Sequence, residues 1–245
     1  MILAYILIFT FIGSIASLAG SFFLLIRRNI TESFSSYLIS FAAGVLLAVA
    51  FLDLLPEAQD AAGELNFFIP TLAGFIIFFF AERYVRLFHH HHQHGEKTPT
   101  ALVLIGDGVH NFVDGVIITA SFLTSIPLGI TTSLAVAAHE IPQEIADMGI
   151  LLANKLSKTK ALTYNFLSAL TALAGALIAF YFAEVIQNNL YVFLAMTAGF
   201  FIYISASDLI PSLHEQSLKD KSFKSLAVFV FGIVLVFVSI KILEG

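Results

Sequence analysis

The sequence predicts an all-α integral membrane protein with eight transmembrane helices. Of its 245 residues, 58% are hydrophobic, 26 are Phe and only 12% are charged, whereas a soluble domain carries about 25% charged residues. The hydrophobic residues form runs of roughly 20, which is enough to cross a bilayer. The chain contains no Cys, so disulfides and thiolate metal sites are excluded.

The expected spans follow one another with short connections, so a single transmembrane domain covers residues 1–245. Arg27 and Arg28 come after the first hydrophobic run, whereas a signal peptide carries its charge in front of that run. We therefore interpret the first run as a retained span. The spans are expected at about 2–26, 36–57, 66–88, 99–123, 129–153, 160–183, 190–211 and 223–242.

The basic residues predict the orientation of these spans. Eleven of the twelve Lys and Arg fall in or beside the odd-numbered connections, and the even-numbered connections contain acids but no Lys or Arg. Connections rich in Lys and Arg stay cytoplasmic. Both termini are therefore expected on the extracytoplasmic side. The net charge of −5 and the absence of a basic patch argue against a nucleic-acid partner.

Two copies of one motif indicate an internal repeat. Asp53-Leu-Leu-Pro56 and Asp208-Leu-Ile-Pro211 each begin nine residues after the glycine of an Ala-Gly pair, and the copies are 155 residues apart. An offset of five spans turns the second copy upside down, which is typical of transporters. We therefore predict a 3+2+3 arrangement, with spans 1–3 and 6–8 as an inverted repeat around two central spans.

The two central spans carry a concentration of acids without any Lys or Arg. A charged group at this depth costs at least ~2.5–3.5 kcal/mol, so a divalent cation is the compensating charge that we expect. A purely structural polar network remains the alternative. The acids are Asp107, Asp114, Glu140, Glu144 and Asp147.

The spacing of polar residues predicts that these two spans form one metal site. Residues three and four apart share a helix face, and a short connection makes the two spans antiparallel neighbours. Nitrogen and oxygen ligands suit Zn²⁺, Fe²⁺ or Mn²⁺. One span presents Asp107, His110, Asn111 and Asp114, and the other presents His139, Glu140, Gln143, Glu144 and Asp147.

An intramembrane zinc protease or hydrolase that uses His139 and Glu140 is the alternative function. That chemistry requires His-Glu-x-x-His on one helix. Here Gln143 stands at the second histidine position and Pro142 lies within the motif. Transport is therefore the preferred hypothesis, and import and export on the same scaffold both remain open at this point.

The sequences His110-Asn111-Phe-Val-Asp114-Gly115 and His139-Glu140-Ile-Pro142-Gln143-Glu144 resemble the signature helices of the ZIP (Zrt/Irt-like protein) metal transporters. The resemblance implies a carrier, not an enzyme, that brings Zn²⁺, and often Fe²⁺, Mn²⁺ or Cd²⁺, into the cytoplasm. It implies a two-ion site formed by His110, Asn111, Asp114, His139, Glu140 and residue 143, with Glu144 as a further ligand or an exit-side charge.

The resemblance also implies an elevator-like motion of spans 1, 4, 5 and 6 against spans 2, 3, 7 and 8. A homodimer in the lipid bilayer of the plasma membrane, or of the inner membrane in a bacterium, is a further expectation.

A transport pathway is predicted on either side of the central site. Asp53 is expected at the outer mouth and Asp208 at the inner mouth, with Asp107 and Asp147 along the inner half of the route. The alternative for Asp53 and Asp208 is a helix cap or kink. A histidine-rich cytoplasmic loop at about 89–97 is expected to bind metal weakly as a regulatory element, or to be only a solvated linker. Its histidines are His89, His90, His91, His92 and His94.

Overall fold

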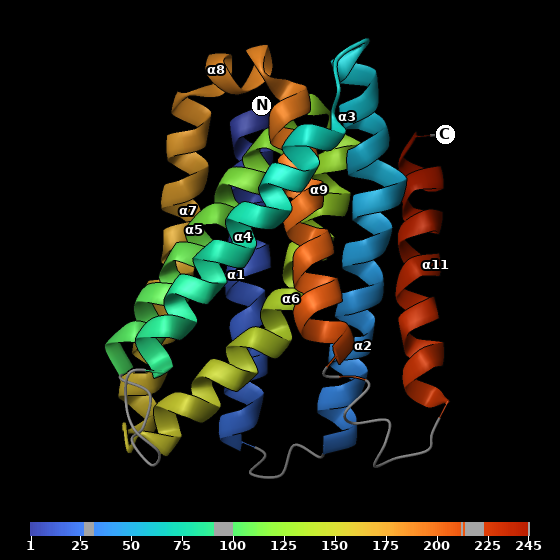
Figure 1. Ribbon diagram of the computed structural model, residues 1–245. Coiled ribbons are helices and arrows are strands. Elements are labelled where there is room, and N and C mark those ends of the chain that lie inside the picture. The colour runs from blue at the N-terminus through green and yellow to red at the C-terminus, as the bar shows by residue number, and fades with distance from the viewer. Residues whose placement is uncertain (27–31, 91–99, 212, 214–222, 245) are drawn as a thin grey trace.

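Long apolar helices form the described part of the protein (Figure 1). The computed structural model describes residues 1–26, 32–90, 100–211, 213 and 223–244, and these ranges contain no β-strand. The elements are α1 (Ile2–Ile26), α2 (Glu32–Val49), η1 (Ala50–Leu54), α3 (Leu55–Ala62), α4 (Phe68–His90), α5 (Thr100–Thr124), α6 (Ile126–Ala153), α7 (Lys158–Tyr181), α8 (Ala183–Asn188), α9 (Leu190–Ile204), η2 (Ser205–Leu209) and α11 (Lys224–Glu244).

Five of the described helical segments are long and apolar enough to cross a membrane. The length and apolar composition of these helices confirm the prediction of a multi-pass membrane protein. Helices α5 and α6, with 25 and 28 residues, would extend about 37 and 42 Å at 1.5 Å per residue. Both helices are long enough to cross a membrane. They are less apolar than the five segments because they contain acidic residues. The five segments are Ile2–Ala19, Ser36–Ala62, Lys158–Tyr181, Leu190–Ser207 and Lys224–Leu243.

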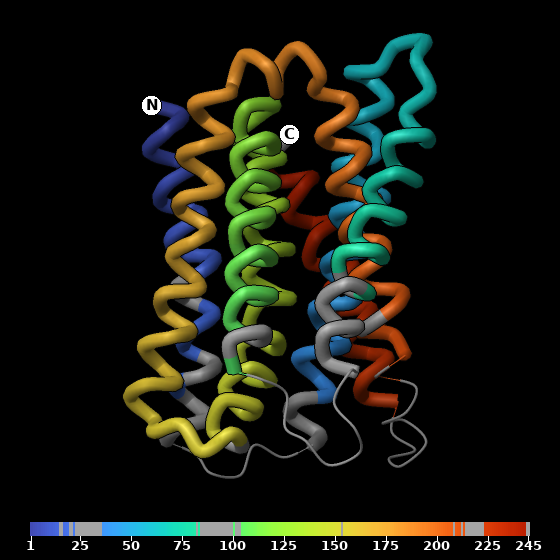
Figure 2. Tube along the Cα trace, turned by 60° about the vertical axis from the view of Figure 1, so that its left-hand side comes forward, coloured from blue at the N-terminus to red at the C-terminus, as the bar shows by residue number. Residues whose placement is uncertain are grey.

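The long helices gather into two groups. Figure 2 shows α1, α5, α6 and α7 on one side of the molecule and α2, α4, α9 and α11 on the other. Within the first group, α5 packs on α6 and α7, and α1 packs on α6 and α7; within the second, α2 packs on α11 and α4 on α9. Helices α2 and α6 provide contact between the groups. The start of α1 and the end of α11 lie at the same end of the bundle (Figure 1).

A wide helical turn precedes the proline of each repeated motif. The π-helical segments η1 and η2 contain Asp53 and Asp208 and end two residues before Pro56 and Pro211. Proline removes a backbone donor and its ring displaces the preceding turn, and a π-bulge accommodates such a disturbance. The second span therefore continues through α3 to Ala62, beyond the end near residue 57 that the sequence predicts.

Close approach of α5 and α7 brings a third helix to the central acids. A Cβ atom added at Gly115 would collide with the backbone of Ala172, and one added at Gly175 would collide with the backbone of Phe112. Small residues permit such contact between membrane helices. Across this seam, the Thr171 hydroxyl donates a hydrogen bond of 2.6 Å to a carbonyl of α5. Helix α7 is therefore fixed against the site-bearing face of α5.

We predict that Gly115→Ala lowers the stability of the protein by about 1–3 kcal/mol, the usual cost of overpacking. Gly149→Ala is the matched control, because a Cβ atom at Gly149 meets nothing within 4 Å and alanine favours a helix by up to ~1 kcal/mol over glycine. The measurement is the melting temperature of each purified variant in one detergent. Equal melting temperatures would contradict the close α5–α7 contact.

Candidate metal site

Two histidines from neighbouring helices meet near the middle of α5 and α6. The Nε2 atoms of His110 and His139 are 3.1 Å apart. The Nδ1 atom of His139 lies 3.0 Å from the carbonyl oxygen of Ala135. Because a carbonyl only accepts, Nδ1 carries the proton, and the lone pair of His139 is on Nε2. That nitrogen is therefore ready to bind a cation.

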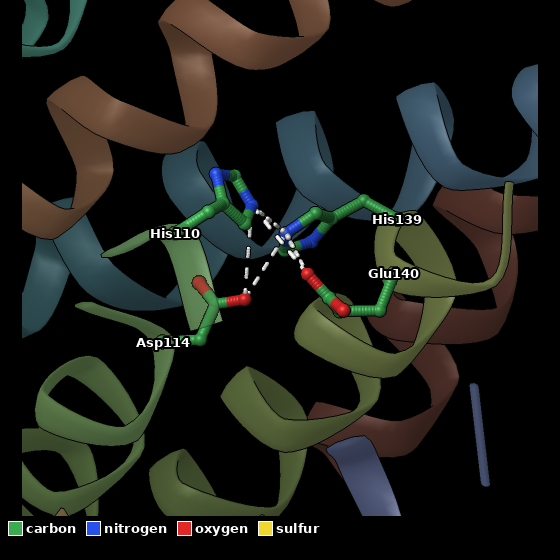
Figure 3. A group of neighbouring side chains, drawn as sticks. All are labelled: His110, Asp114, His139 and Glu140. Atoms are coloured by element: carbon green, nitrogen blue, oxygen red, sulfur yellow. Dashed lines mark hydrogen bonds and ion pairs between the residues drawn. The ribbon is translucent and has the colours of Figure 1, made fainter. Parts of the chain in front are cut away.

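Two carboxylates complete a cluster around these nitrogens (Figure 3). Asp114 Oδ2 lies 3.4 Å from His139 Nε2 and 3.8 Å from His110 Nε2. Glu140 Oε1 lies 3.6 Å from His110 Nε2 and 3.9 Å from His139 Nε2. Ligands about 2.0–2.2 Å from a tetrahedral Zn²⁺ are separated from one another by roughly 3.3–3.6 Å. The histidine cluster (His110, Asp114, His139 and Glu140) therefore has nearly the spacing that one such ion requires.

Three of the four carboxylate oxygens of this cluster are buried without a hydrogen-bond donor. Asp114 is 3% and Glu140 0% exposed, and Asp114 Oδ2 and both carboxylate oxygens of Glu140 receive no hydrogen bond. A buried charge is tolerated when it is paired or coordinates a metal. The donor set of two imidazoles and two carboxylates fits Zn²⁺ and similar divalent ions.

A second group of acids shares Glu140 with the first. One carboxylate oxygen from each of Asp107, Glu140 and Glu144 lies within 4.8 Å of the others. We call these three residues the acidic cluster. All three side chains are buried, and Asn165 of α7 donates a hydrogen bond of 2.6 Å to Glu144 Oε2.

Asn111 and Gln143, which are predicted ligands, both contact Asp107 of the acidic cluster. The Asn111 amide nitrogen donates to Asp107 Oδ1 at 3.0 Å, and the Gln143 amide nitrogen lies 3.4 Å from the same oxygen. Asp107 supplies one carboxylate oxygen to the acidic cluster, and its place along the inner route stays a prediction. Asp147 is partly buried and lies outside both clusters.

Asp53 lies inside the bundle between the two helix groups. Its side chain is 3% exposed, and its Oδ2 atom accepts a hydrogen bond from the hydroxyl of Thr131 on α6. The side chain of its repeat counterpart, Asp208, lies outside the described part of the structure. The same holds for the side chains of His89 and His90 and for all of residues 91–99, so the predicted histidine-rich loop stays a prediction.

Asn165 is the site residue that the sequence analysis does not identify. The sixth span contains no carboxylate within 161–183, and an amide is neither a charge nor a strong ligand. The sequence does contain a pattern that marks this helix face. Small or polar residues recur at helical spacing and form the buried face of α7, among them Asn165, Ser168, Ala172 and Gly175. The partner of Asn165 across the helix interface could not be read from that pattern.

The geometry agrees with the comparison of this chain with known families. A family model described as "ZIP Zinc transporter" matches residues 1–102 and 90–240. The chain belongs to the ZIP family. Among related ZIP proteins, "Zinc transporter ZIP10" of Danio rerio is 42% identical over 121 residues, which cover 49% of this chain and 14% of the relative.

Two further ZIP relatives extend the comparison. "Zinc transporter zipt-7.2" of Caenorhabditis elegans is 29% identical across 88% of this chain and 60% of its own length. "Metal cation symporter ZIP14" of Xenopus tropicalis is 38% identical across 49% of this chain and 26% of its own length. The chain therefore spans less than two thirds of each of these relatives. All three are named as transporters, so the hydrolase alternative is not favoured.

We predict that Zn²⁺ stabilises the protein through the histidine cluster. A ligand present at 100 times its Kd stabilises the state that binds it by about 2.7 kcal/mol. We therefore expect Zn²⁺ to raise the melting temperature of the parent and to raise that of His110→Ala much less. Both proteins should carry His89, His90, His91, His92 and His94 replaced by Ser, which we call the loop-serine background. The same shift in both proteins would contradict binding at His110.

Proposed function

We propose that this protein carries divalent metal ions, foremost Zn²⁺, across the membrane into the cytoplasm. The observation that carries this proposal is the histidine cluster, in which two Nε2 atoms and two carboxylates surround one point between the middle parts of α5 and α6. A binding site at mid-depth is typical of secondary transporters. The zinc transporters and the metal cation symporter among the relatives support the same activity.

We also propose that α5 and α6 cross the membrane, together with α4 and the five more apolar segments. Membrane helices carry charges where these face the bundle interior, and Asp107, Asp114, Glu140 and Glu144 are all buried. These acids lower the mean hydropathy of α5 and α6. A cation bound between the two helices would explain why the acids are there. These eight segments then form a 3+2+3 arrangement.

Helix packing supports the inverted repeat. Gly44 of α2 meets the backbone of α11, and Gly199 of α9 meets the backbone of α4. Gly44 and Gly199 are 155 residues apart, the same offset as that between η1 and η2. Each copy of the repeat thus packs its middle span against the last span of the other copy.

The orientation follows from the charged ends of the bundle. Lys155, Lys158 and Lys160 are exposed at the α6–α7 connection, whereas Glu64 and Glu184 are exposed at the opposite end. The end rich in Lys faces the cytoplasm by the positive-inside rule. Both termini are then extracytoplasmic, as in a plasma-membrane importer.

The two helix groups support an elevator-like movement. Both clusters are formed by α5 and α6, with Asn165 supplied by α7, so the whole site belongs to the group of α1, α5, α6 and α7. That group can carry the ion past α2, α4, α9 and α11 without taking the site apart. Binding of Fe²⁺, Mn²⁺ or Cd²⁺ and assembly as a homodimer are proposed from the family resemblance.

We predict that His110→Ala lowers Zn²⁺ uptake into proteoliposomes at least roughly tenfold, since disturbing a metal site typically costs 10–100-fold. Glu184→Gln is the control, because Glu184 is an exposed acid on α8 and its removal should leave uptake unchanged. The measurement is the initial rate of Zn²⁺ entry at equal protein density. Equal rates for His110→Ala and the parent would defeat the proposed transport site.

Asp53 gives a second prediction, for the outer half of the pathway. Asp53→Asn keeps the shape of the side chain and its ability to accept from Thr131, but it removes the charge. If this charge attracts cations, the apparent affinity for Zn²⁺ in the uptake assay falls several-fold, and less so at high salt because salt screens the attraction.

Thr131→Val is the matched variant for this prediction, because it keeps the Asp53 charge and removes its hydrogen-bond donor. The pathway role predicts a loss of affinity in Asp53→Asn that Thr131→Val does not share. Impaired uptake in Thr131→Val alone, with Asp53→Asn unaffected, would assign Asp53 a purely structural role.

A further inference from the structure

A groove lies between α1 and α7, away from the metal ligands. The two helices pack on each other and run side by side in Figure 2. The groove has a volume of about 490 Å³, within the range of about 300–1,000 Å³ that is typical of small-molecule sites. Its lining residues are Leu18, Ala19 and Phe22 of α1 and Leu162, Thr163 and Phe166 of α7.

The lining of the groove is almost entirely hydrocarbon. Leu18 is 8% exposed and lies deep, whereas Phe22 and Phe166 are 52% and 41% exposed and form the rim. The hydroxyl of Thr163 is the one polar side-chain group among the lining residues. The groove therefore suits an apolar ligand that enters from the side of the bundle, where the spans proposed above face lipid.

The size of the groove favours an acyl chain over a helix as its occupant. Two turns of a helix about 10 Å wide fill roughly 850 Å³, which exceeds the groove volume of about 490 Å³. An acyl chain is much thinner than a helix and bends to follow an apolar surface. The surrounding bilayer supplies such chains at high local concentration.

The charges on the two helices select the headgroup of that lipid. Helices α1 and α7 contain no Asp or Glu, and their charged residues are Lys158 and Lys160. Both lysines are exposed. Lys158, Leu162 and Phe166 follow one another at intervals of four residues, so they share one stripe of α7. Lys160 is two residues from Lys158 and points away from that stripe.

The position of Lys158 matches the dimensions of a phospholipid. Leu162 and Phe166 are four and eight residues from Lys158, which corresponds to roughly 6–12 Å along the helix. A phospholipid extends over this distance from its phosphate into the upper part of an acyl chain. The end of the bundle that carries Lys158 is proposed above to face the cytoplasm, and the cytoplasmic leaflet contains the anionic lipids.

We propose that the groove between α1 and α7 binds an acyl chain of an anionic phospholipid from the cytoplasmic leaflet, with the lipid phosphate held by Lys158. The lipid contacts both helices and stabilises their packing beside the metal site. This proposal goes beyond the transport activity and rests on the membrane orientation proposed with it.

The test is native mass spectrometry of the purified full-length protein. The protein is released from detergent micelles that contain equal amounts of phosphatidylglycerol and phosphatidylcholine with identical acyl chains, and each retained lipid is counted. Lys158→Gln removes the charge, Lys158→Arg keeps it, and Lys160→Gln is the matched control on another stripe of α7. Ala19→Phe fills the groove with a ring.

We expect the parent to retain one phosphatidylglycerol per chain in preference to phosphatidylcholine. Lys158→Gln should reduce this preference about fivefold, the contribution of one Lys near an anionic lipid surface, whereas Lys158→Arg and Lys160→Gln should keep it. Ala19→Phe should weaken retention of both lipids at least tenfold, because each displaced methylene weakens binding about fourfold. The ratio of the two lipids should not change in Ala19→Phe.

Equal retention of the two lipids by the parent would overturn the proposal, as would equal losses in Lys158→Gln and Lys160→Gln, which indicate a general surface charge. Unchanged lipid retention in Ala19→Phe would exclude the acyl chain from the groove. Displacement of the lipid by excess inorganic phosphate would reduce the site to a simple anion site. The measurement involves neither Zn²⁺ nor uptake, so its failure is distinguishable from that of the transport function, which fails if His110→Ala leaves uptake unchanged.

Discussion

The structure depends on a concentration of acidic side chains that are buried between α5 and α6, two helices that contain no Lys or Arg. Asp107, Asp114, Glu140 and Glu144 approach one another across the α5–α6 interface. Lipid and packed helices keep water away, so the Coulomb repulsion among these acids is much stronger than it would be in solution. In the proposed transport cycle, a divalent cation relieves this repulsion and is also the cargo. The repulsion among the buried acids is thus the origin of both the affinity of the site for a cation and the need for charge compensation.

The surrounding fold keeps these groups in position. Gly115 and Gly175 allow α7 to approach α5 backbone to backbone, and this contact brings Asn165 within hydrogen-bond distance of Glu144. Pro142 lies inside α6 and cannot supply the backbone hydrogen bond that the carbonyl of Ala138 would otherwise accept. The helix therefore lacks one backbone hydrogen bond beside His139. The site belongs to one group of helices, while contacts such as Asp53 with Thr131 join it to the other group.

Features that arise from local patterns were predictable. Hydrophobic length and composition indicated the membrane helices, and the four-residue spacing of His110 and Asp114 indicated a shared face. The constant offset between Asp53 and Asp208 indicated an internal repeat, and the two aspartates lie in the π-helical segments η1 and η2. The short helix α8 was not predicted, because Ala183–Asn188 has no periodic apolar pattern of sufficient length.

Features that depend on pairing between distant residues were not predictable. Nothing in the sixth span indicates that Asn165 meets Glu144, because that contact requires the register of α7 on α5. Asn111 and Gln143 have the right spacing for ligands, but spacing does not indicate that both amide nitrogens lie beside Asp107 Oδ1. That contact follows from packing in three dimensions, and the role of both residues as ligands stays a prediction.

X-ray absorption at the zinc edge tests the central claim most directly. The sample is the purified loop-serine protein loaded with one Zn²⁺, compared with the His110→Ala/His139→Ala double variant of the same protein. The account predicts nitrogen and oxygen neighbours at about 2.0–2.2 Å with the outer-shell scattering of two imidazoles, and loss of that imidazole scattering in the double variant. The same imidazole signal in both proteins, or zinc in the parent surrounded by oxygen alone, would contradict a cation bound between α5 and α6 by His110 and His139.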